Sequence, residues 1–493
     1  MKHKNKILPY IFTLVLIFLF SFLFFYRLDY NTLANWDEAW YASIARDILK
    51  SGNWIDTSFN GRPFYDHPPL GFWLMSLSYK IFGINEFSTR FPSAFLGLLT
   101  IILVFFISRK LFKNDYIAFV SSLILGTSVW YVLRVRSGNL DSILLFFYAL
   151  TVYFSLKAKD NFFWFILTGI AFGFLVLSKT LVGISAIFLI FLINFQNFLK
   201  LFSSKKNFLK NFLIILISFV LFFLIVSPWY KFHLEKYPDF FYHHFFYIGI
   251  RRKTLQDFLK LNYQLPFFYL HMGVRKWYYL WWVSLIYFFI SLKFLKKEIF
   301  FILFWNIVVL YPFLTTDLTH IWHLLPVYLP MSMVIAGSFY YLGRSMYGWL
   351  QKKFRKINLF KKYFLKIDFF NFIYLFCFLI LTVIQIKNFY KEIIPQSRYL
   401  PDEVEISKRL TKYKEKIFLD DDFLPIAVFY SNKEIIPLYM MPDQKKTMVK
   451  LFQSNEKNFI IVTRNWAVKN LDTENIKYKF LEKNNSYSIL KKE

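Results

Sequence analysis

Two adjacent carboxylic acids, Asp37 and Glu38, stand near the start of a segment whose spacing predicts a helix lying on a membrane surface. The segment, residues 35–50, reads NWDEAWYASIARDILK, and its apolar residues recur at the spacing of one helical face. Asn35 followed three residues later by Glu38 resembles a capping box, so Glu38 either caps the helix or works in a site. Asp37 is not needed for that cap. Because an ionised carboxylate at a membrane boundary can take a proton from a hydroxyl, we predict that Asp37 is a general base.

An Asp-His pair in the same loop forms a second polar group. Asp66 and His67 come directly before Pro68 and Pro69, which impose an extended approach to a second, strongly apolar helix. A pair of this kind in a loop is usually solvated polar sequence. Its position between two surface helices, in the same loop as Asp37, favours a functional site.

The composition shows which solvent these residues meet. The chain has 493 residues, of which 57% are hydrophobic, 23% aromatic and 18% charged, so it is too apolar for a soluble protein of several domains. The formal net charge of +29 would fit nucleic-acid binding if the lysines formed patches on a polar surface, but they fall between long apolar runs. We therefore expect membrane lipids and no nucleic acid as partners. Cys377 is the only cysteine, so no intrachain disulfide can form.

The long apolar runs predict about eleven transmembrane helices, each able to cross roughly 30 Å of hydrocarbon. They lie near residues 7–26, 91–109, 116–133, 140–156, 162–178, 180–198, 211–229, 279–294, 298–314, 321–343 and 368–387. The first run is expected to be a retained anchor and not a cleaved signal, because it is long and no small-residue cleavage site follows.

The basic connections predict the orientation. With a cytoplasmic N-terminus, alternate crossings place every strongly basic loop inside, as the distribution of lysine and arginine in membrane proteins requires. These loops are Arg109–Lys113, Lys157–Lys159, Lys200–Lys210, Lys293–Lys297 and Arg344–Lys366. The same count places residues 27–90, 134–139, 230–278, 315–320 and everything after about 388 outside.

The polar tail predicts a separate unit. Its short β-type runs, KIFLDD, IAVFYS, NFIIVTR and YSILK, alternate with segments that could be helical. We expect a transmembrane domain over residues 1–390 and a small extracytoplasmic α/β domain over residues 391–493.

Several motifs in this order resemble a known family. They are the Asp37-Glu38 pair after the first span, Arg46, residues 52–61, Asp66 to Leu70, Glu86, Arg90 to Ala94, Asp141, Ser178-Lys179, Ser227 to Tyr230 and the run HIWHLLPVYLP from His320 to Pro330. This arrangement is similar to the bacterial branch of the protein mannosyltransferase superfamily, which includes the aminoarabinose transferases acting on lipid A. The resemblance covers about residues 27–345. It implies an all-α polytopic membrane protein with the GT-C fold.

The resemblance also implies a reaction. We expect an integral membrane glycosyltransferase that moves a hexose or pentose from a polyprenyl-phosphate donor to lipid A, another glycolipid or a glycan. The site would face the periplasm or exterior of a bacterial plasma membrane. Because nucleotide sugars are absent there, the donor must be delivered through the bilayer. Direct attack on the anomeric carbon through an oxocarbenium-like transition state would invert its configuration.

The roles follow from the charges that such a transfer needs. Asp37 is the expected base, with Glu38 and Asp141 as further acids, although Asp141 could equally form a structural ion pair with Arg134 or Arg136. The expected phosphate ligands are Arg251, Arg252, Lys179 and His67, with Arg275 as a further candidate. Arg46, Asp66, His320 and His323 complete the expected substrate contacts. No cofactor is required, but His243, His244, His320 and His323 are the residues that would hold a divalent metal.

Three other functions remain open at this point. The first is transfer to protein hydroxyls, in the manner of a protein O-mannosyltransferase. The second is a transporter or flippase for a lipid-linked glycan, which should bury charges at mid-depth in several spans, whereas the ionisable residues here stand mostly at span ends. The third is an inactive relative acting as a scaffold.

Overall fold

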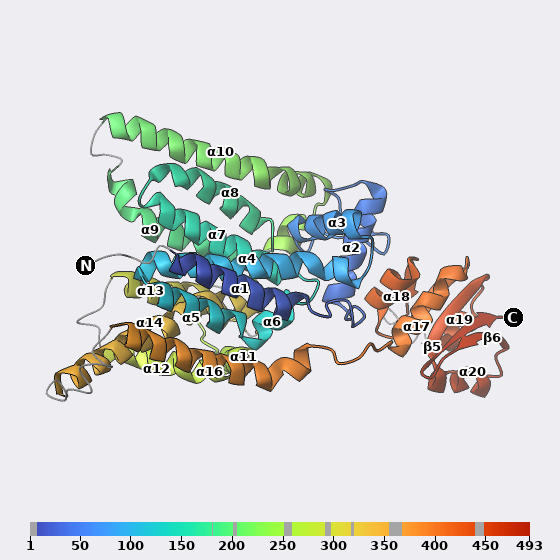
Figure 1. The fold of residues 1–493 in the computed structure, drawn as a ribbon. Coiled ribbons are helices and arrows are strands. Elements are labelled where there is room, and N and C mark those ends of the chain that lie inside the picture. Colours follow the sequence, from blue (N-terminus) through green and yellow to red (C-terminus); the bar gives the residue numbers. More distant parts are fainter. Residues whose placement is uncertain are drawn as a thin grey trace.

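A bundle of long helices and a small sheet domain make up the chain. The computed structural model describes residues 7–179, 181–200, 205–250, 259–290, 297–316, 320–353, 367–438 and 448–493. Figure 1 shows the long helices lying side by side, two shorter helices at one end of the bundle, and the sheet domain beyond them. The N-terminus lies at the opposite end of the bundle.

The bundle contains most of the helices, and the loop between α1 (Leu8–Phe25) and α4 (Glu86–Phe112) contains α2 (Asp37–Ser51) and α3 (Leu70–Phe82). The other helices are α5 (Asp115–Gly126), α6 (Val129–Val135), α7 (Asp141–Ala158), η1 (Phe162–Trp164), α8 (Phe165–Val176), η2 (Val182–Ser185), α9 (Ala186–Lys200), α10 (Lys205–Lys236), the π-helix η4 (Tyr242–Ile250), α11 (Gln264–Val274), α12 (Lys276–Ile290), α13 (Lys297–Leu314), η7 (Ile321–Leu324), α14 (Leu325–Lys353) and α16 (Ile367–Ile393). A two-stranded ribbon, β1 (Ser58–Phe59) and β2 (Arg62–Pro63), separates α2 from α3.

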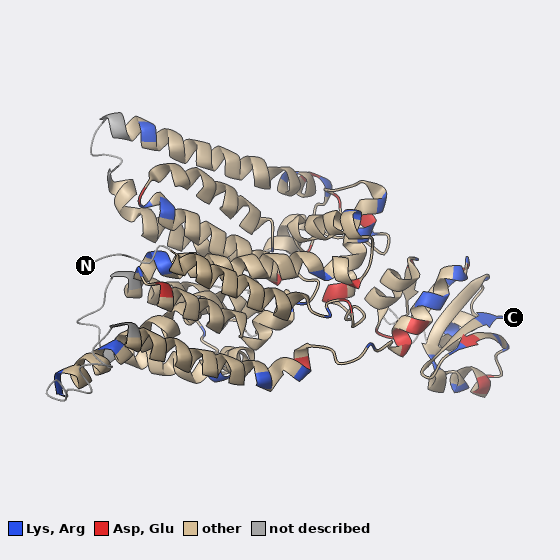
Figure 2. Ribbon diagram, in the orientation of Figure 1, with Lys and Arg blue, Asp and Glu red and all other residues tan. Residues whose placement is uncertain are grey.

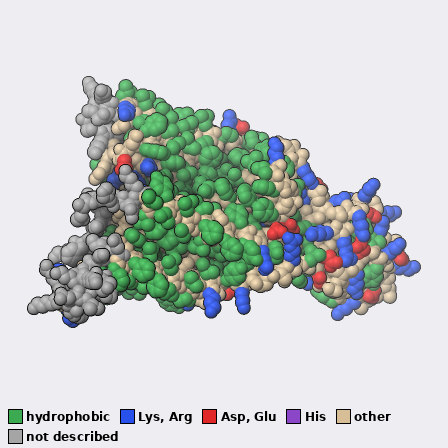
Figure 3. Space-filling model, viewed as in Figure 1, with side chains coloured by type: hydrophobic (Ala, Val, Ile, Leu, Met, Phe, Trp, Pro, Cys, Tyr) green, Lys and Arg blue, Asp and Glu red, His purple; other side chains and the backbone are tan. Residues whose placement is uncertain are grey.

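Each of the eleven predicted spans is mainly helical in the part that the structure describes. Seven helices, or eight if one bent pair counts as a span, are long and apolar enough to cross a membrane among the described residues. Shorter apolar helices cover 162–176 and 299–314, and α12 leads into residues 291–296, outside the described part. Hydrophobic side chains cover the middle of the bundle in Figure 3, and charges gather at its ends in Figure 2. The chain is a multi-pass membrane protein.

The third predicted span is not one straight helix. It consists of α5 and α6, which meet at an angle of 70°. Helix α5 ends at Gly126, which directly precedes the break, and glycine favours the end of a helix. The hydroxyls of Thr127 and Ser128 also donate to the carbonyls of Leu123 and Ile124, at 2.6 and 2.9 Å, and so compete with the helical ladder. The amide of Gln385 donates to the carbonyl of Thr127. The bend redirects α6 toward the loop between α1 and α4, where Arg134 contacts Asp37.

The two helices predicted in the first loop are present as α2 and α3. The predicted capping box is wrong: α2 begins at Asp37 without a side-chain cap, and the amide of Asn35 donates instead to the carbonyl of Asp422 at 2.6 Å. Trp36, just before Asp37, has φ +63° and ψ −119°, a conformation that a bulky residue rarely adopts. Such strained backbone is typical of functional sites. Here it directly precedes Asp37, the first residue of α2.

The tail forms a five-stranded mixed sheet with short helices. Its elements are α17 (Asp402–Arg409), η8 (Leu410–Lys412), β3 (Lys416–Asp420), α18 (Leu424–Ser431), β4 (Ile435–Pro437), α19 (Met448–Gln453), β5 (Phe459–Arg464), η9 (Asn465–Ala467), α20 (Lys469–Thr473), β6 (Tyr478–Lys483) and β7 (Tyr487–Lys492). The strand order is β4-β3-β5-β7-β6, with β3 parallel to both β4 and β5 and the other pairs antiparallel. The predicted α/β character is confirmed.

One predicted strand of this domain is a helix. The run IAVFYS belongs to α18, which begins with Pro425 in its first turn and ends before Asn432 in the left-handed conformation. Apolar residues are buried on all its sides, so the sequence showed no alternation that could distinguish helix from strand.

The sheet domain packs on the loop between α1 and α4. A shared hydrophobic core joins Ala42 and Ile44 of α2 to Ala427 and Val428 of α18. Polar contacts reinforce it: the Tyr430 hydroxyl donates to Glu86 at 2.8 Å and accepts from the backbone N–H of Leu33 at 2.8 Å. The helix that carries Asp37 is therefore held between the bundle and the sheet domain.

Arg46 belongs to this interface. Its side chain is buried, and it donates to the carbonyls of Val428 and Phe429 at 3.0 Å each and to Asp47. The structure therefore does not bring Arg46 to a substrate pocket. It places this guanidinium at the end of α18, where it donates to the carbonyl of Phe429 and is a second donor to that of Val428, which also accepts from the backbone N–H of Asn432.

We predict that Arg46→Ala weakens the docking of the sheet domain. The carbonyl of Phe429 would lose its side-chain donor and that of Val428 would keep only the N–H of Asn432, which costs about 1 to 3 kcal/mol of unfolding free energy. Thermal unfolding and proteolysis of the connection between α16 and α17 in detergent would measure the change. The exposed Arg62 provides the control, since Arg62→Ala should leave the unfolding temperature almost unchanged. Equal unfolding temperatures for both variants would contradict the assignment.

Candidate active site

A pocket of about 420 Å³ opens where the first loop meets the bundle. Its lining comes from elements that are far apart in the sequence: Asp37 and Tyr41 of α2, His67, Lys179, Leu181, Val182, Ile184, Ser185, Phe188, Ile248, Gly249, Val309, Pro312, Phe313, Thr316, His320, Trp322, His323 and Pro326. Five predicted site residues, Asp37, His67, Lys179, His320 and His323, thus meet in one cavity.

Two kinds of wall make up this pocket. Asp37, His67, Lys179 and the two histidines are polar, whereas Leu181, Val182, Phe188, Val309 and Phe313 form an apolar wall. Ile184 and Phe188, in η2 and α9, are 41% and 60% exposed, so the apolar wall continues onto the outer surface of the bundle. The pocket therefore fits an amphipathic molecule that enters from the lipid side.

A charged network stands behind the polar wall. The Nζ of Lys179 donates to Oδ1 of Asp141 at 2.5 Å, and Arg134 donates to Oδ2 of Asp141 from Nε at 2.7 Å and from Nη2 at 2.5 Å. Nη2 of Arg134 also lies 3.2 Å from Oδ2 of Asp37. The Asp141 side chain is only 1% exposed, and it is absent from the pocket lining. The Asp141 carboxylate therefore holds the side chains of Arg134 and Lys179 in place without lining the pocket itself.

Local structure explains how these groups meet. Asp141 opens α7, where the N–H groups of residues 141 and 142 donate to the side chain of Asn139 and the helix dipole favours a carboxylate. The backbone N–H of Leu70, at the start of α3, donates to the carbonyl of Leu177 at 3.1 Å. This bond joins the loop that carries His67 to the segment that carries Lys179.

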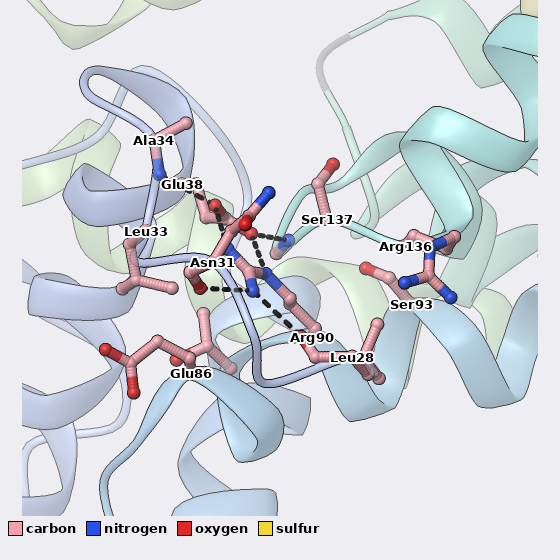
Figure 4. Close-up of polar contacts among 12 residues, drawn as sticks. Leu28, Asn31, Leu33, Ala34, Glu38, Glu86, Arg90, Ser93, Arg136 and Ser137 are labelled. Atoms are coloured by element: carbon pink, nitrogen blue, oxygen red, sulfur yellow. Dashed lines mark hydrogen bonds and ion pairs between the residues drawn. The ribbon is translucent and has the colours of Figure 1, made fainter. Parts of the chain in front are cut away.

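Glu38 has a different environment from its neighbour. Figure 4 shows its carboxylate facing Arg90, which donates to it at 2.7 and 2.9 Å and directs its remaining N–H groups at the carbonyls of Leu28, Asn31 and Thr32. The backbone N–H groups of Ala34 and Gly138 also donate to Glu38. Burial raises the pKa of Glu38, but the Arg90 charge and these donors outweigh it and hold the pKa below its ordinary value. Glu38 thus braces the first loop from outside the pocket.

The histidines near residue 243 are engaged by protein groups. His243 Nε2 lies 2.7 Å from Oδ1 of Asp66. His244 is fully buried; its Nδ1 lies 3.1 Å from the carbonyl of Tyr65, and its Nε2 lies 3.4 Å from the Tyr230 hydroxyl. Because a carbonyl only accepts, Nδ1 carries the proton. Burial lowers the pKa of His244 to about 4, so the ring is neutral at ordinary pH.

The histidines that were expected to hold a divalent metal do not form a metal site in the described part of the chain. Among the residues that the structure describes, no three His, Cys, Asp or Glu side chains group closely enough to hold a metal ion. His320 directly precedes η7 and His323 lies in it; their ring centroids are 5.3 Å apart, and the backbone N–H of His320 donates to Nδ1 of His323. His243 and His244 are engaged elsewhere, as described above.

The remaining predicted residues lie elsewhere. Arg251 and Arg252 fall outside the described residues. Arg275 forms an ion pair with Glu392 of α16 at 2.6 Å and does not line the pocket. Asp66 is also outside the lining but pairs with His243, and so fixes the turn that presents His67.

Two residues at the site were missed as site residues. Arg134 was recognised only as an ion-pair partner for Asp141, and Trp322 not at all. The guanidinium of Arg134 lies 5.0 Å from the ring centre of Trp322, which lines the pocket. Only the fold shows that α6 and η7 meet, so no local signal could have found this contact.

Comparisons with known proteins agree with this fold. A model of the dolichyl-phosphate-mannose-protein mannosyltransferase family matches residues 66–230. An undecaprenyl phosphate-α-4-amino-4-deoxy-L-arabinose arabinosyl transferase of Proteus mirabilis is 29% identical over 54% of this chain and 47% of its own length. A protein of the same name from an Enterobacter species is 34% identical over 24% of this chain and 21% of its own. The aligned part of this chain thus spans less than half the length of either relative.

Solved structures match over more of the chain. ArnT from Cupriavidus metallidurans, bound to undecaprenyl phosphate, aligns with a TM-score of 0.67 and 15% identity over 97% of both chains. The oligosaccharyltransferase AglB from Archaeoglobus fulgidus aligns with a TM-score of 0.60 and 10% identity over 94% of this chain and 70% of its own. The protein therefore has the GT-C membrane fold. The predicted resemblance to bacterial protein mannosyltransferase-like and aminoarabinose transferase-like proteins is confirmed.

Proposed function

We propose that this protein is a membrane glycosyltransferase that takes a sugar from a polyprenyl-phosphate donor and transfers it to a glycolipid or glycan. The observation that carries this proposal is the pocket itself, in which a carboxylate and an ammonium group stand beside an apolar wall that reaches the lipid-facing surface. A polyprenyl phosphate has the same division into an anionic head and an apolar tail. The relatives named above, which carry undecaprenyl phosphate in their names or in their structure, support this donor.

The residues of the pocket suit each part of the reaction. Asp37 accepts the proton of the acceptor hydroxyl while that oxygen bonds to the anomeric carbon of the sugar. The bond from the anomeric carbon to the phosphate oxygen breaks, and its electron pair leaves with the lipid phosphate. Lys179 and His67 line the same pocket and offset the charge of that phosphate. Attack opposite the leaving group inverts the anomeric configuration.

The finer parts of the proposal concern the sugar and the orientation. The names of the relatives favour an aminopentose, and hence a pentosyltransferase acting on lipid A or a similar glycolipid. We propose that the pocket faces the periplasm or exterior of the plasma membrane. Arg109, Lys110 and Lys157 support this orientation, because they end α4 and α7 at the end of each helix away from the pocket.

The charges of the bundle do not favour transport. Arg134, Asp141 and Lys179 form one cluster beside the external loop, and Figure 2 shows Lys, Arg, Asp and Glu mainly at the two ends of the bundle. A pathway for a polar glycan would need such groups along the depth of the described spans.

Mass spectrometry of the cell envelope tests this proposal. We expect a deletion strain to lose one glycosylated lipid or glycan and to regain it when the wild-type gene is restored. Secreted proteins should keep their glycans. Loss of protein glycans alone would support transfer to protein hydroxyls, and unchanged lipids, glycans and proteins would contradict the proposed function.

A further inference from the structure

Arg134 is shared between two carboxylates at the edge of the pocket. Its guanidinium donates twice to Asp141, at 2.7 and 2.5 Å, and once to Asp37, at 3.2 Å. The Arg134 side chain is 12% exposed, whereas that of Asp37 is 39% exposed. The fork of an arginine can serve two acceptors in fixed directions, which a lysine ammonium does not do.

An aromatic contact fixes the plane of this guanidinium. Arg134 lies 5.0 Å from the ring centre of Trp322, and the same ring stacks with His320 at 4.7 Å between centroids and 11° between planes. Trp130, four residues before Arg134, lies 6.0 Å from Trp322. The bend between α5 and α6 brings Trp130 and Arg134 to this position. Hydrogen bonds and the aromatic contact thus both restrain Arg134.

The charges around the two carboxylates differ. Asp141 has both Lys179 and Arg134 as partners. For Asp37, Arg134 is the one cation within ion-pair distance in the described part of the chain. Losing Arg134 therefore leaves Asp141 with a partner and leaves the more exposed Asp37 with none among these residues.

We propose that Arg134 is a positioning residue, which holds the Asp37 carboxylate in the direction needed to receive the proton of the acceptor. Arg134 does not line the pocket and acts through Asp37, which does. This inference rests on the proposed function. In this account, the bend between α5 and α6 brings Arg134 to Asp37, and Arg134 then orients the Asp37 carboxylate.

The test compares Arg134→Lys with Arg136→Lys in the full-length protein. Arg136 is two residues away and also buried, but it donates to the carbonyls of Leu23, Phe24 and Arg27 at the end of α1. Both substitutions keep the charge and remove the fork. Correct folding of each variant is checked by its unfolding temperature in detergent.

The kinetic readout separates positioning from general damage. We expect Arg134→Lys to lower kcat by about 10- to 100-fold, because a small displacement of the base is costly, with KM for the lipid donor changed by less than about threefold. Arg136→Lys should retain the kcat of the wild type. A folded Arg134→Lys protein with unchanged kcat would overturn the inference.

A second readout does not depend on transfer. Carbodiimide coupling of glycine ethyl ester labels a carboxyl group according to its accessibility, and the contact with Arg134 covers one oxygen of the Asp37 carboxylate. We expect Arg134→Gln to increase the labelling of Asp37 several-fold over wild type, quantified by peptide mass spectrometry, and Arg136→Lys to leave it unchanged. Unchanged labelling in Arg134→Gln would also overturn the inference. If the wild type transfers no sugar, the proposed function fails, while this labelling still decides whether Arg134 acts on Asp37.

Discussion

Asp37→Asn is expected to fold and insert normally but to lose transfer activity by about 100- to 10,000-fold, the range that a general base contributes. Asparagine keeps the size of the side chain and can still accept a hydrogen bond from Arg134. It cannot take the proton of an acceptor hydroxyl. Since the Asp37 side chain is 39% exposed, the substitution should cost little stability. The measurement is the initial rate of sugar transfer by purified protein, normalised to folded protein.

Asp29 offers a matched control in the same loop, between α1 and α4. Its side chain is 43% exposed and pairs with Arg398 at 2.6 Å, and it does not line the pocket. Asp29→Asn should therefore retain the rate of the wild type, because an exposed ion pair contributes little. A folded Asp37→Asn protein with more than about a tenth of the wild-type rate would remove Asp37 from the role of base.

Asp141→Asn should produce the largest loss of stability. The carboxylate is buried between Arg134 and Lys179, and its loss leaves two buried cations without their shared partner. Breaking a buried pair in this way costs about 3 to 5 kcal/mol. Transfer should fall as well, because Lys179 loses the group that holds it at the pocket. Thermal unfolding in detergent measures the first effect, and the transfer assay the second.

Asp160 provides the comparison for this variant. It lies just beyond the other end of α7 and pairs with Lys110, but its side chain is 70% exposed. Asp160→Asn should therefore change stability by less than about 1 kcal/mol. If Asp141→Asn unfolded at the same temperature as Asp160→Asn, the ion pairs of Asp141 would not stabilise the fold as proposed.

The sequence could predict the first external loop in some detail. The apolar face of residues 35–50 and the Pro68-Pro69 pair predicted α2 and α3, and both are present. The break between α5 and α6 was not predicted, although Gly126 precedes it, because its angle also depends on the hydroxyl groups of Thr127 and Ser128. Hydroxyl groups bend a helix only in some contexts, so the sequence alone does not reveal it.

The sequence predicted several residues of the candidate site, but it predicted the role of each residue less well. Counting crossings placed the loops of Asp37, His67 and His320 on one side of the membrane, and the structure brings these residues into one pocket. Glu38 and Arg46 were expected at the site from residue type and resemblance, but buried partners hold both outside it. A charged residue that braces a loop has the same sequence signature as one that meets substrate. Only the contacts distinguish them.

A reconstituted transfer assay tests the central claim most directly. Purified protein in liposomes is given a polyprenyl-phosphate-linked aminopentose and a lipid acceptor, and both lipids are followed by mass spectrometry. We predict equal amounts of released polyprenyl phosphate and glycosylated acceptor with the wild type, and neither with Asp37→Asn. Movement of intact donor across the bilayer without any glycosylated acceptor, or equal transfer by both proteins, would contradict the account.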